Sequence, residues 1–283
     1  MEILNRNWSK NLQSLLNNLD QELIISSPFI AKEGVEFLLK NCSENFRTMG
    51  KFTLITNLSS KNILQDSIDT NSIFSLYEKF KNFNLFHLQN LHSKIYFTKQ
   101  ETIITSGNLT KNGLFINYEY GISTKDNKII NIIRNDIAEY GSVGIGINAK
   151  EMRKLCILQQ EILKLQTKED VEQIEVNDKL IEINSILLDL KDTTTRHNIF
   201  EKTILYLLKQ TKTLSTGEIK NKIKEIHSDL CNDDIYYQNS KGRRFGRLWF
   251  VYVRSALQTL KKKGIIEQIG ENKNKREFIW RVK

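Results

Sequence analysis

The stretch Leu91-His-Ser-Lys-Ile-Tyr-Phe97 places an imidazole and an ammonium two residues apart in an otherwise apolar run of β-forming residues. Because side chains alternate across a strand, a strand here would present His92 and Lys94 on one face. That face would hold a nitrogen able to attack or to shuttle protons, with a fixed positive charge beside it. This pairing suits attack on a phosphate diester.

Two further polar segments follow this stretch. A short turn and a second apolar run, which includes Ile103-Ile104, lead to Ser106-Gly-Asn-Leu-Thr110, and Glu119 comes eleven residues after Asn108. We expect the segments around His92, Ile103 and Glu119 to be strands of one meander. The candidate catalytic residues are therefore His92, Lys94, Ser106, Asn108 and Glu119. His87 lies at an odd offset from His92, and we interpret it as structural.

Upstream of this region, apolar strands alternate with segments of helical spacing. The predicted strands are Glu22–Ile30, which turns at Pro28, and Lys51–Thr56, and the predicted helices are Gly34–Lys40 and Ile73–Phe80. This alternation predicts an α/β layer architecture. We assign residues 1–150 to this domain and residues 151–192, where apolar residues recur at helical intervals, to a helical connector.

Residues 193–283 have the pattern of an α+β winged helix. A first helix at 197–209 precedes a second one that opens at Leu214-Ser-Thr-Gly-Glu218, where Ser215 and Glu218 are spaced as a capping box. A third helix at about 246–263 stops at Gly264. The segments 265–269 and 277–282 then form a two-stranded wing.

The net charge of +9 is concentrated in this last part of the 283-residue chain. Residues 193–283 carry 20 Lys and Arg against 9 Asp and Glu, which leaves the first 192 residues with a net charge of −2. A basic domain beside a nearly neutral one indicates nucleic acid as the partner. An alternative explanation is a lysine-rich, AT-biased genome.

The sequence shows neither a signal peptide nor a stretch typical of a transmembrane span. Its three cysteines, Cys42, Cys156 and Cys231, are far apart and form no CxxC pair, which indicates neither a disulfide framework nor a zinc site. These features favour a cytoplasmic protein without a membrane partner.

The residues quoted above resemble the phospholipase D superfamily, whose signature is His-x-Lys, a Gly/Ser-Ser-x-Asn element and a downstream acid. Matching elements are Ser27-Pro-Phe-Ile30, His92-x-Lys94, Ser106-Gly-Asn108 and Glu119, within about residues 20 to 125. The resemblance implies a phospholipase D-like mixed sheet flanked by helices. The aspartate that many members carry five residues after the lysine is replaced by Lys99, which counts against lipid hydrolysis.

The resemblance also implies roles for these residues. His92 would attack phosphorus and form a phosphohistidine, while Lys94, Asn108 and Ser106 would hold the non-bridging oxygens. Glu119 would orient the imidazole. A second histidine must protonate the leaving oxygen, and the chain has one His-x-Lys only. A homodimer with one shared active site would supply it, without a metal ion or another cofactor.

The start of the third helix carries basic residues typical of DNA reading. The candidate DNA contacts are Arg243, Arg244, Arg247, Tyr252, Arg254, Lys273, Lys275 and Arg276. We therefore predict a metal-independent, site-specific endonuclease of double-stranded DNA, of the type II restriction class. The alternatives are an RNA or non-specific nuclease, a catalytically silent DNA-binding regulator, and a lipid-acting phospholipase or phosphatidyltransferase. Winged helices also mediate protein contacts.

Overall fold

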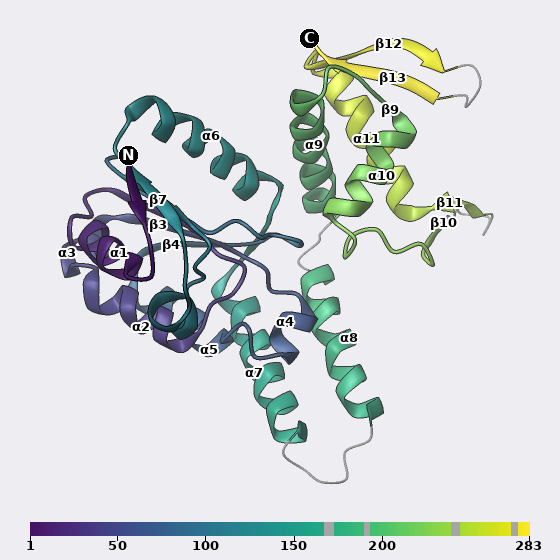
Figure 1. Cartoon of the computed structure of the whole chain (residues 1–283). Helices are drawn as coiled ribbons and strands as arrows, with labels where there is room; N and C mark the ends of the chain where they lie inside the picture. Colours follow the sequence, from purple (N-terminus) through teal and green to yellow (C-terminus); the bar gives the residue numbers. More distant parts are fainter. Residues whose placement is uncertain (167–172, 190–192, 239–243, 273–276) are drawn as a thin grey trace. The chain divides into compact units, whose positions relative to one another are not determined.

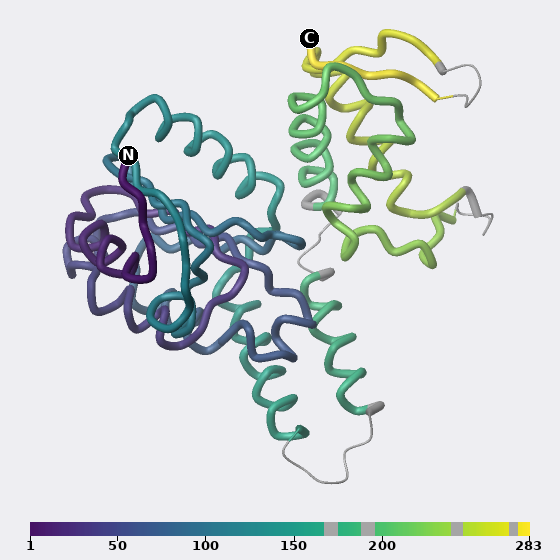
Figure 2. Tube along the Cα trace, in the orientation of Figure 1, coloured from purple at the N-terminus to yellow at the C-terminus, as the bar shows by residue number. Residues whose placement is uncertain are grey.

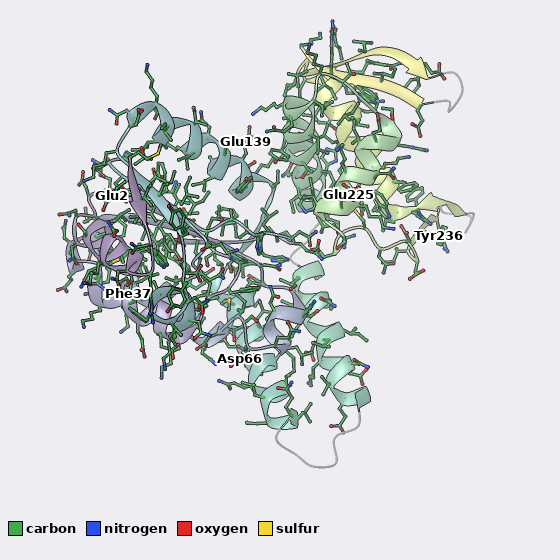
Figure 3. All side chains as sticks on the ribbon, viewed as in Figure 1. Glu2, Phe37, Asp66, Glu139, Glu225 and Tyr236 are labelled. Carbon is green, nitrogen blue, oxygen red and sulfur yellow. The ribbon has the colours of Figure 1, made fainter. Side chains whose placement is uncertain are left out.

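The computed structural model describes residues 1–166, 173–189, 193–238, 244–272 and 277–283. The chain divides into two compact units, Met1–Ile186 and Leu187–Lys283 (Figure 1). Each unit buries apolar side chains of its own, and the side chains of both are drawn in Figure 3. No helix in the described ranges is long and apolar enough to cross a membrane.

The first unit is built on an eight-stranded mixed sheet in the order β1-β7-β6-β5-β2-β3-β4-β8. Its strands are β1 (Glu2–Leu4), β2 (Glu22–Ser26), β3 (Lys51–Thr56), β4 (Asn82–His87), β5 (Ile95–Phe97), β6 (Thr102–Thr105), β7 (Gly121–Thr124) and β8 (Ile145–Ile147). Strands β2, β3 and β4 run parallel, and the remaining pairs are antiparallel. The N-terminal strand β1, in purple, lies beside β7, in teal (Figure 2).

The middle of this sheet is deeply buried. Every residue of β3 after Lys51 is buried, as are the last four residues of β2. Burial of consecutive residues is typical of parallel strands that are covered on both faces. The sheet with its flanking helices confirms the predicted α/β class.

Helices connect and cover the strands. They are α1 (Trp8–Asn17), α2 (Lys32–Asn41), α3 (Glu44–Met49), α4 (Ser60–Leu64), α5 (Thr70–Lys79), the short π-helix η1 (Asn112–Ile116), α6 (Asn127–Val143), α7 (Ala149–Gln166) and α8 (Gln173–Asp189). Helix α7 is tied to the unit by the buried side chain of Gln159. Its amide oxygen accepts from Thr70 N at 2.9 Å, and its amide nitrogen donates to the carbonyls of Ile63 at 3.2 Å and Ile68 at 2.6 Å.

The predicted meander is confirmed, but its strands are shorter than the sequence indicated. Strands β5, β6 and β7 are antiparallel neighbours, whereas His92 and Lys94 precede β5 and Glu119 precedes β7. The prediction that these three residues lie within strands was therefore wrong. The His92 carbonyl accepts from the Lys94 ammonium at 2.8 Å instead of pairing in a ladder.

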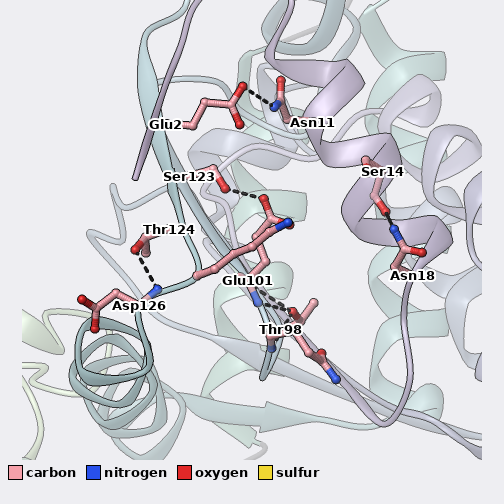
Figure 4. A network of polar contacts seen from close by, with 11 residues as sticks. Glu2, Asn11, Ser14, Asn18, Thr98, Glu101, Ser123, Thr124 and Asp126 are labelled. Carbon is pink, nitrogen blue, oxygen red and sulfur yellow. Dashed lines mark hydrogen bonds and ion pairs between the residues drawn. The ribbon is translucent and has the colours of Figure 1, made fainter.

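Polar contacts fix the turns at the other end of this meander (Figure 4). Between β5 and β6, Thr98 Oγ1 donates to the Glu101 carbonyl at 2.9 Å, and the Glu101 carboxylate accepts from Ser123 of β7. Beyond β7, Asp126 N donates to Thr124 Oγ1 at 3.2 Å, and the Asp126 carboxylate caps the start of α6. The hairpin ends are thus held by side chains as well as by the ladder.

The second unit combines helices with a small antiparallel sheet. Its elements are α9 (Thr193–Gln210), β9 (Leu214–Ser215), α10 (Thr216–Ile226), β10 (Tyr236–Gln238), β11 (Arg244–Arg247), α11 (Leu248–Lys262), β12 (Ile266–Asn272) and β13 (Glu277–Val282). Strands β12, β13 and β9 form one sheet in that order, and β10 pairs with β11. This arrangement confirms the predicted α+β class, but the β10–β11 pair was not predicted.

Local signals in the sequence account for the ends of two helices in this unit. At the start of α10, Ser215 Oγ accepts from Glu218 N at 3.2 Å, and the Glu218 carboxylate accepts from Ser215 N at 2.7 Å. This is the predicted capping box. Beyond the end of α11, Gly264 adopts a φ of 71°, a left-handed conformation that favours glycine. The predicted helix stop is confirmed.

Gly34, in α2, is packed against the loop that follows β6. A Cβ added at this position would lie 2.1 Å from the Leu109 carbonyl oxygen. We expect Gly34→Ala to lower the free energy of unfolding by roughly 2–3 kcal/mol, because two backbones must separate. Chemical denaturation would measure this loss.

Gly141→Ala is the matched control for this change. Gly141 lies in α6, and the nearest atom to its added Cβ is Ile55 Cδ1 at 3.8 Å. Alanine there is expected to stabilise the protein by about 0.5–1 kcal/mol, because it favours the helix. Equal stabilities of the two variants would contradict the close packing at Gly34.

Candidate active site

His92 and Lys94 lie side by side on the extended segment that leads into β5. The Lys94 ammonium donates to His92 Nε2 at 3.2 Å and to the His92 carbonyl at 2.8 Å. An ammonium only donates, so in this contact Nε2 is the acceptor. The Lys94 side chain is buried, with 8% of its surface exposed, whereas His92 is exposed. The contact therefore places a ring nitrogen of an exposed imidazole beside a buried positive charge.

This segment is attached to the centre of the sheet through two serines. Ser26, the last residue of β2, is fully buried, and its Oγ lies 2.6 Å from Ser93 Oγ. Ser93 stands between the histidine and the lysine. The contact of Ser93 with a buried hydroxyl thus sets the position of the backbone that carries both functional side chains.

The loop after β6 is held beside the same segment. Thr105 N donates to the Lys94 carbonyl at 3.1 Å, and the hydroxyl of the buried Tyr96 donates to the Gly107 carbonyl at 3.1 Å. A Cβ at Gly107 would lie 2.5 Å from the ring of Trp8. The loop backbone is therefore fixed by close packing from α1 and β5.

Asn108 is the residue of this loop with an unsatisfied polar atom. Its Oδ1 is buried and has no hydrogen-bond partner among the described residues. A half-turn of the amide would put Nδ2, a donor, in the same place. Buried polar groups are normally hydrogen-bonded, so this amide is a candidate for contact with a bound group.

Glu119 is paired with the same loop. Its carboxylate accepts from Ser106 Oγ and, at 3.1 Å, from Asn117 Nδ2. Ser106 Oγ in turn accepts from Tyr120 N at 3.1 Å. Within the described residues, the Glu119 carboxylate is bonded to Ser106 and Asn117 and forms no hydrogen bond with the His92 ring. The orienting contact that the sequence led us to expect is not present here.

The charges of the site act on Lys94 in opposite directions. Burial lowers the pKa of the Lys94 ammonium, and the nearby Glu119 carboxylate raises it to a smaller extent. The lysine thus sits in a poorly hydrated position with one acidic neighbour. A charge held in this way acts more strongly on a neighbouring anion than one in water.

The other histidines have structural surroundings. His87 is buried, and its Nδ1 accepts from Leu58 N at 3.0 Å, in agreement with the structural interpretation. His197 pairs with Glu201 at 2.8 Å, and the buried His227 lies 2.8 Å from Thr203 Oγ1. Across the described ranges, no group of three or more His, Cys, Asp or Glu is placed to hold a metal ion. Cys42, Cys156 and Cys231 are all buried.

The candidate DNA contacts are only partly described. Arg243, Lys273, Lys275 and Arg276 lie outside the described residues, and Arg244 begins β11. Arg247 forms an ion pair with Asp233 at 3.2 Å. A hydrogen bond from Lys224, and then one from Trp249, hold the pKa of Asp233 below its usual range.

The last two candidates lie on α11. The guanidinium of Arg196 stands 5.9 Å from the centre of the Tyr252 ring, and Arg254 is exposed. Arg254 is therefore accessible to a ligand, whereas the Tyr252 ring is in contact with α9.

Sequence reasoning missed Ser26 as part of this site. We expect Ser26→Ala to reduce the turnover of the candidate site by about tenfold, because Ser93 loses the partner that fixes the His92 backbone. The rate should fall with KM little changed, and Ser26→Thr, which restores a hydroxyl, should recover part of the rate. Steady-state kinetics would measure both parameters, and a rise in KM alone would argue against positioning.

No protein-family model matches the sequence, and no curated protein matches it. Solved structures similar to it include NucT from Helicobacter pylori, at 16% identity with 52% of this chain and 100% of that one covered and a TM-score of 0.41. Nuc from Salmonella typhimurium, a phospholipase D family member, has 11% identity, 52% and 97% coverage and a TM-score of 0.41. TrmBL2, an archaeal chromatin protein with a novel mode of DNA binding, has 14% identity, 51% and 53% coverage and a TM-score of 0.37. Because these values are low, we assign function from the site residues.

Proposed function

We propose that this chain is a metal-independent phosphodiesterase of the phospholipase D type that cleaves double-stranded DNA. The observation that carries the proposal is the contact of the buried Lys94 ammonium with the exposed His92 Nε2. It provides a nucleophile and a fixed positive charge in one place. The loop of Ser106 and Asn108 is held beside them.

In the first step, His92 Nε2 attacks phosphorus, a P–N bond forms and the P–O bond to the leaving oxygen breaks. Lys94 turns its ammonium to the non-bridging oxygens, where negative charge gathers in the transition state. Asn108 donates to the same oxygens through its unsatisfied amide, and Ser106 assists. Glu119 holds Ser106 in position and keeps Lys94 protonated.

The leaving oxygen needs a proton, and we propose that His92 of a second copy supplies it. In the second step that histidine takes a proton from water, the water oxygen attacks phosphorus and the P–N bond breaks. The products are a phosphate monoester and free His92. One active site is then shared by a homodimer.

Exposed apolar side chains near the site support this dimer. Phe115, Ile116, Tyr118 and Tyr120 surround Glu119 in the sequence, and each has about half or more of its surface exposed, between 49% and 84%. Exposed apolar groups gathered in one segment are typical of a surface that another protein covers. Sedimentation velocity of the full chain would measure the dimer.

We further propose that the second unit is a winged-helix domain, residues 193–283, that selects the DNA sequence. The order of α9, β9, α10, α11, β12 and β13, with its short antiparallel sheet, supports this assignment. Residues 1–150 would cleave and dimerise, and residues 151–192 would connect the two. Separate cleaving and selecting parts would suit a type II restriction enzyme.

Incubation of the purified protein with unmethylated phage DNA in excess EDTA, followed by gel electrophoresis, tests this function. Discrete fragments are expected. A smear would argue against sequence selection, and cleavage that appears only when a metal ion is added would exclude the metal-independent mechanism. If DNA stays intact and RNA is cut, the substrate is RNA. If no phosphodiester is cut, a catalytically silent DNA-binding regulator is the better description.

A further inference from the structure

The second unit contains a pocket that the proposed chemistry does not use. It has a volume of about 510 Å³ and lies where α10, α11 and β13 meet. Pockets that bind small molecules or parts of larger ligands span roughly 300–1,000 Å³. Its polar and aromatic lining includes Thr216, Lys220, Arg254, Gln258, Glu277 and Phe278.

Two cations face this pocket from different helices. Lys220, on α10, is half-buried with its ammonium 4.3 Å from the centre of the Phe250 ring, and Arg254 is on α11. Burial lowers the pKa of Lys220, and the charge of Arg254 lowers it further, against a smaller opposite effect of Glu277. The two positive charges are therefore close enough to repel each other.

These cations differ from their neighbours in having no anionic partner in the part of the unit that the structure describes. Arg247 pairs with Asp233, and Lys263 pairs with Glu201 at 2.7 Å, whereas neither Lys220 nor Arg254 forms an ion pair. Glu277, the acid in the pocket lining, accepts from Gly217 N at 3.2 Å. Two like charges held together at a pocket are stabilised when an anion binds between them.

The remaining lining fits the organic part of a nucleotide. Phe278 has 41% of its surface exposed, and its ring stands edge-on to Trp280 with centroids 6.3 Å apart. An exposed aromatic ring is a stacking surface for a base. Gln258 adds an amide that can both donate and accept, and Glu277 adds an acceptor for an amino group.

We propose that this pocket binds a phosphate group between Lys220 and Arg254, with the attached nucleoside against Phe278. The inference rests on the proposed nucleic-acid function and names a site for it. The same chemistry is present in a free nucleotide and in a DNA nucleotide whose base is turned out of the duplex stack. The α11 face that includes Arg254 and Gln258 favours DNA as the source, because a helix in this position of a winged helix enters the major groove.

The test measures binding rather than cleavage, with the full chain carrying His92→Ala so that DNA stays intact. Fluorescence anisotropy with a labelled short duplex gives Kd at several NaCl concentrations between about 50 and 200 mM. Lys220→Met with Arg254→Gln removes both charges and keeps most of each stem. Lys212→Met, at an exposed lysine of the same unit, is the matched control. Calorimetry with deoxycytidine monophosphate forms the second arm.

For the double variant we expect a Kd about fivefold higher at 150 mM NaCl and a slope of log K against log salt that is smaller by about 0.9, the loss of one phosphate contact. Lys212→Met should change neither value. If the double variant loses nucleotide binding but keeps DNA binding, the phosphate site is supported with a free nucleotide as its source. If it keeps both and melts at the native temperature, the inference is overturned.

The wild-type result separates this inference from the proposed function. If the protein with an intact pocket binds no nucleic acid at any salt concentration, the proposed DNA-binding role fails. If it binds DNA and the double variant binds equally well, only the pocket is wrongly assigned. Phe278→Ala is expected to weaken binding about tenfold, and Phe278→Leu less than Phe278→Ala.

Discussion

His92→Ala should leave the protein unable to cleave DNA, with a rate at least roughly 10⁴-fold below that of the wild type. The reason is that the variant has lost the nucleophile, and in the proposed dimer it has also lost the general acid. Its affinity for DNA should be unchanged, because the residues proposed to bind DNA lie in the other unit. Single-turnover cleavage and anisotropy would measure the two properties separately.

His197→Ala is the matched control, since it removes an imidazole of the second unit that pairs with Glu201. It should cleave at the native rate. A covalent adduct of the protein with a cleaved DNA strand, trapped by acid-free quenching from the wild type and absent from His92→Ala, would identify the covalent step. Cleavage by His92→Ala within tenfold of the native rate would rule out the proposed nucleophile.

Lys94→Met should lower the cleavage rate by roughly 10³-fold, because the transition state loses a buried positive charge. Methionine preserves much of the volume of the lysine stem, so the thermal stability should change little. Lys99→Met is the matched control. Lys99 is exposed on the same hairpin and donates to Gln21 at 3.0 Å, so its loss should leave the rate unchanged. Equal rates for both variants would exclude a role for Lys94.

The pH dependence gives a second measure of Lys94. Burial lowers the pKa of its ammonium, so the group loses its proton at a lower pH than an ordinary lysine, whose pKa is about 10.4. As the pH is raised, the cleavage rate of the wild type should therefore begin to fall before the ordinary lysine pKa of about 10.4 is reached. Lys94→Arg keeps the charge at every accessible pH and should move the decline upward. An unchanged alkaline limb in this variant would assign it to another group.

Sequence patterns were most informative for helices and strands whose structure depends on residues within the same element. The run Lys51–Thr56 is a strand with the predicted bounds, because its short apolar run is buried from Phe52 onward in the centre of the sheet. The capping box at Ser215 and the end of α11 before Gly264 were likewise predictable from the sequence, since each depends on residues within one helical turn. Local chemistry was sufficient for these features.

Features that depend on distant parts of the chain were not predicted. Strand β5 pairs with β2, and the hydroxyl contact of Ser26 with Ser93 follows from that pairing. Neither serine stands out in its own neighbourhood. The start of β5 after Lys94 was also missed, because the lysine side chain takes the backbone carbonyl that a longer strand would use.

The buried surroundings of Gln159 distinguish glutamine from glutamate, two side chains of nearly identical shape. Its amide offers an acceptor to Thr70 on one side and a donor to the carbonyls of Ile63 and Ile68 on the other. A glutamate would occupy the same volume and satisfy Thr70, but it would turn an oxygen toward two carbonyl oxygens. The position of Gln159 on α7 therefore favours glutamine over glutamate by the direction of the amide dipole rather than by side-chain size.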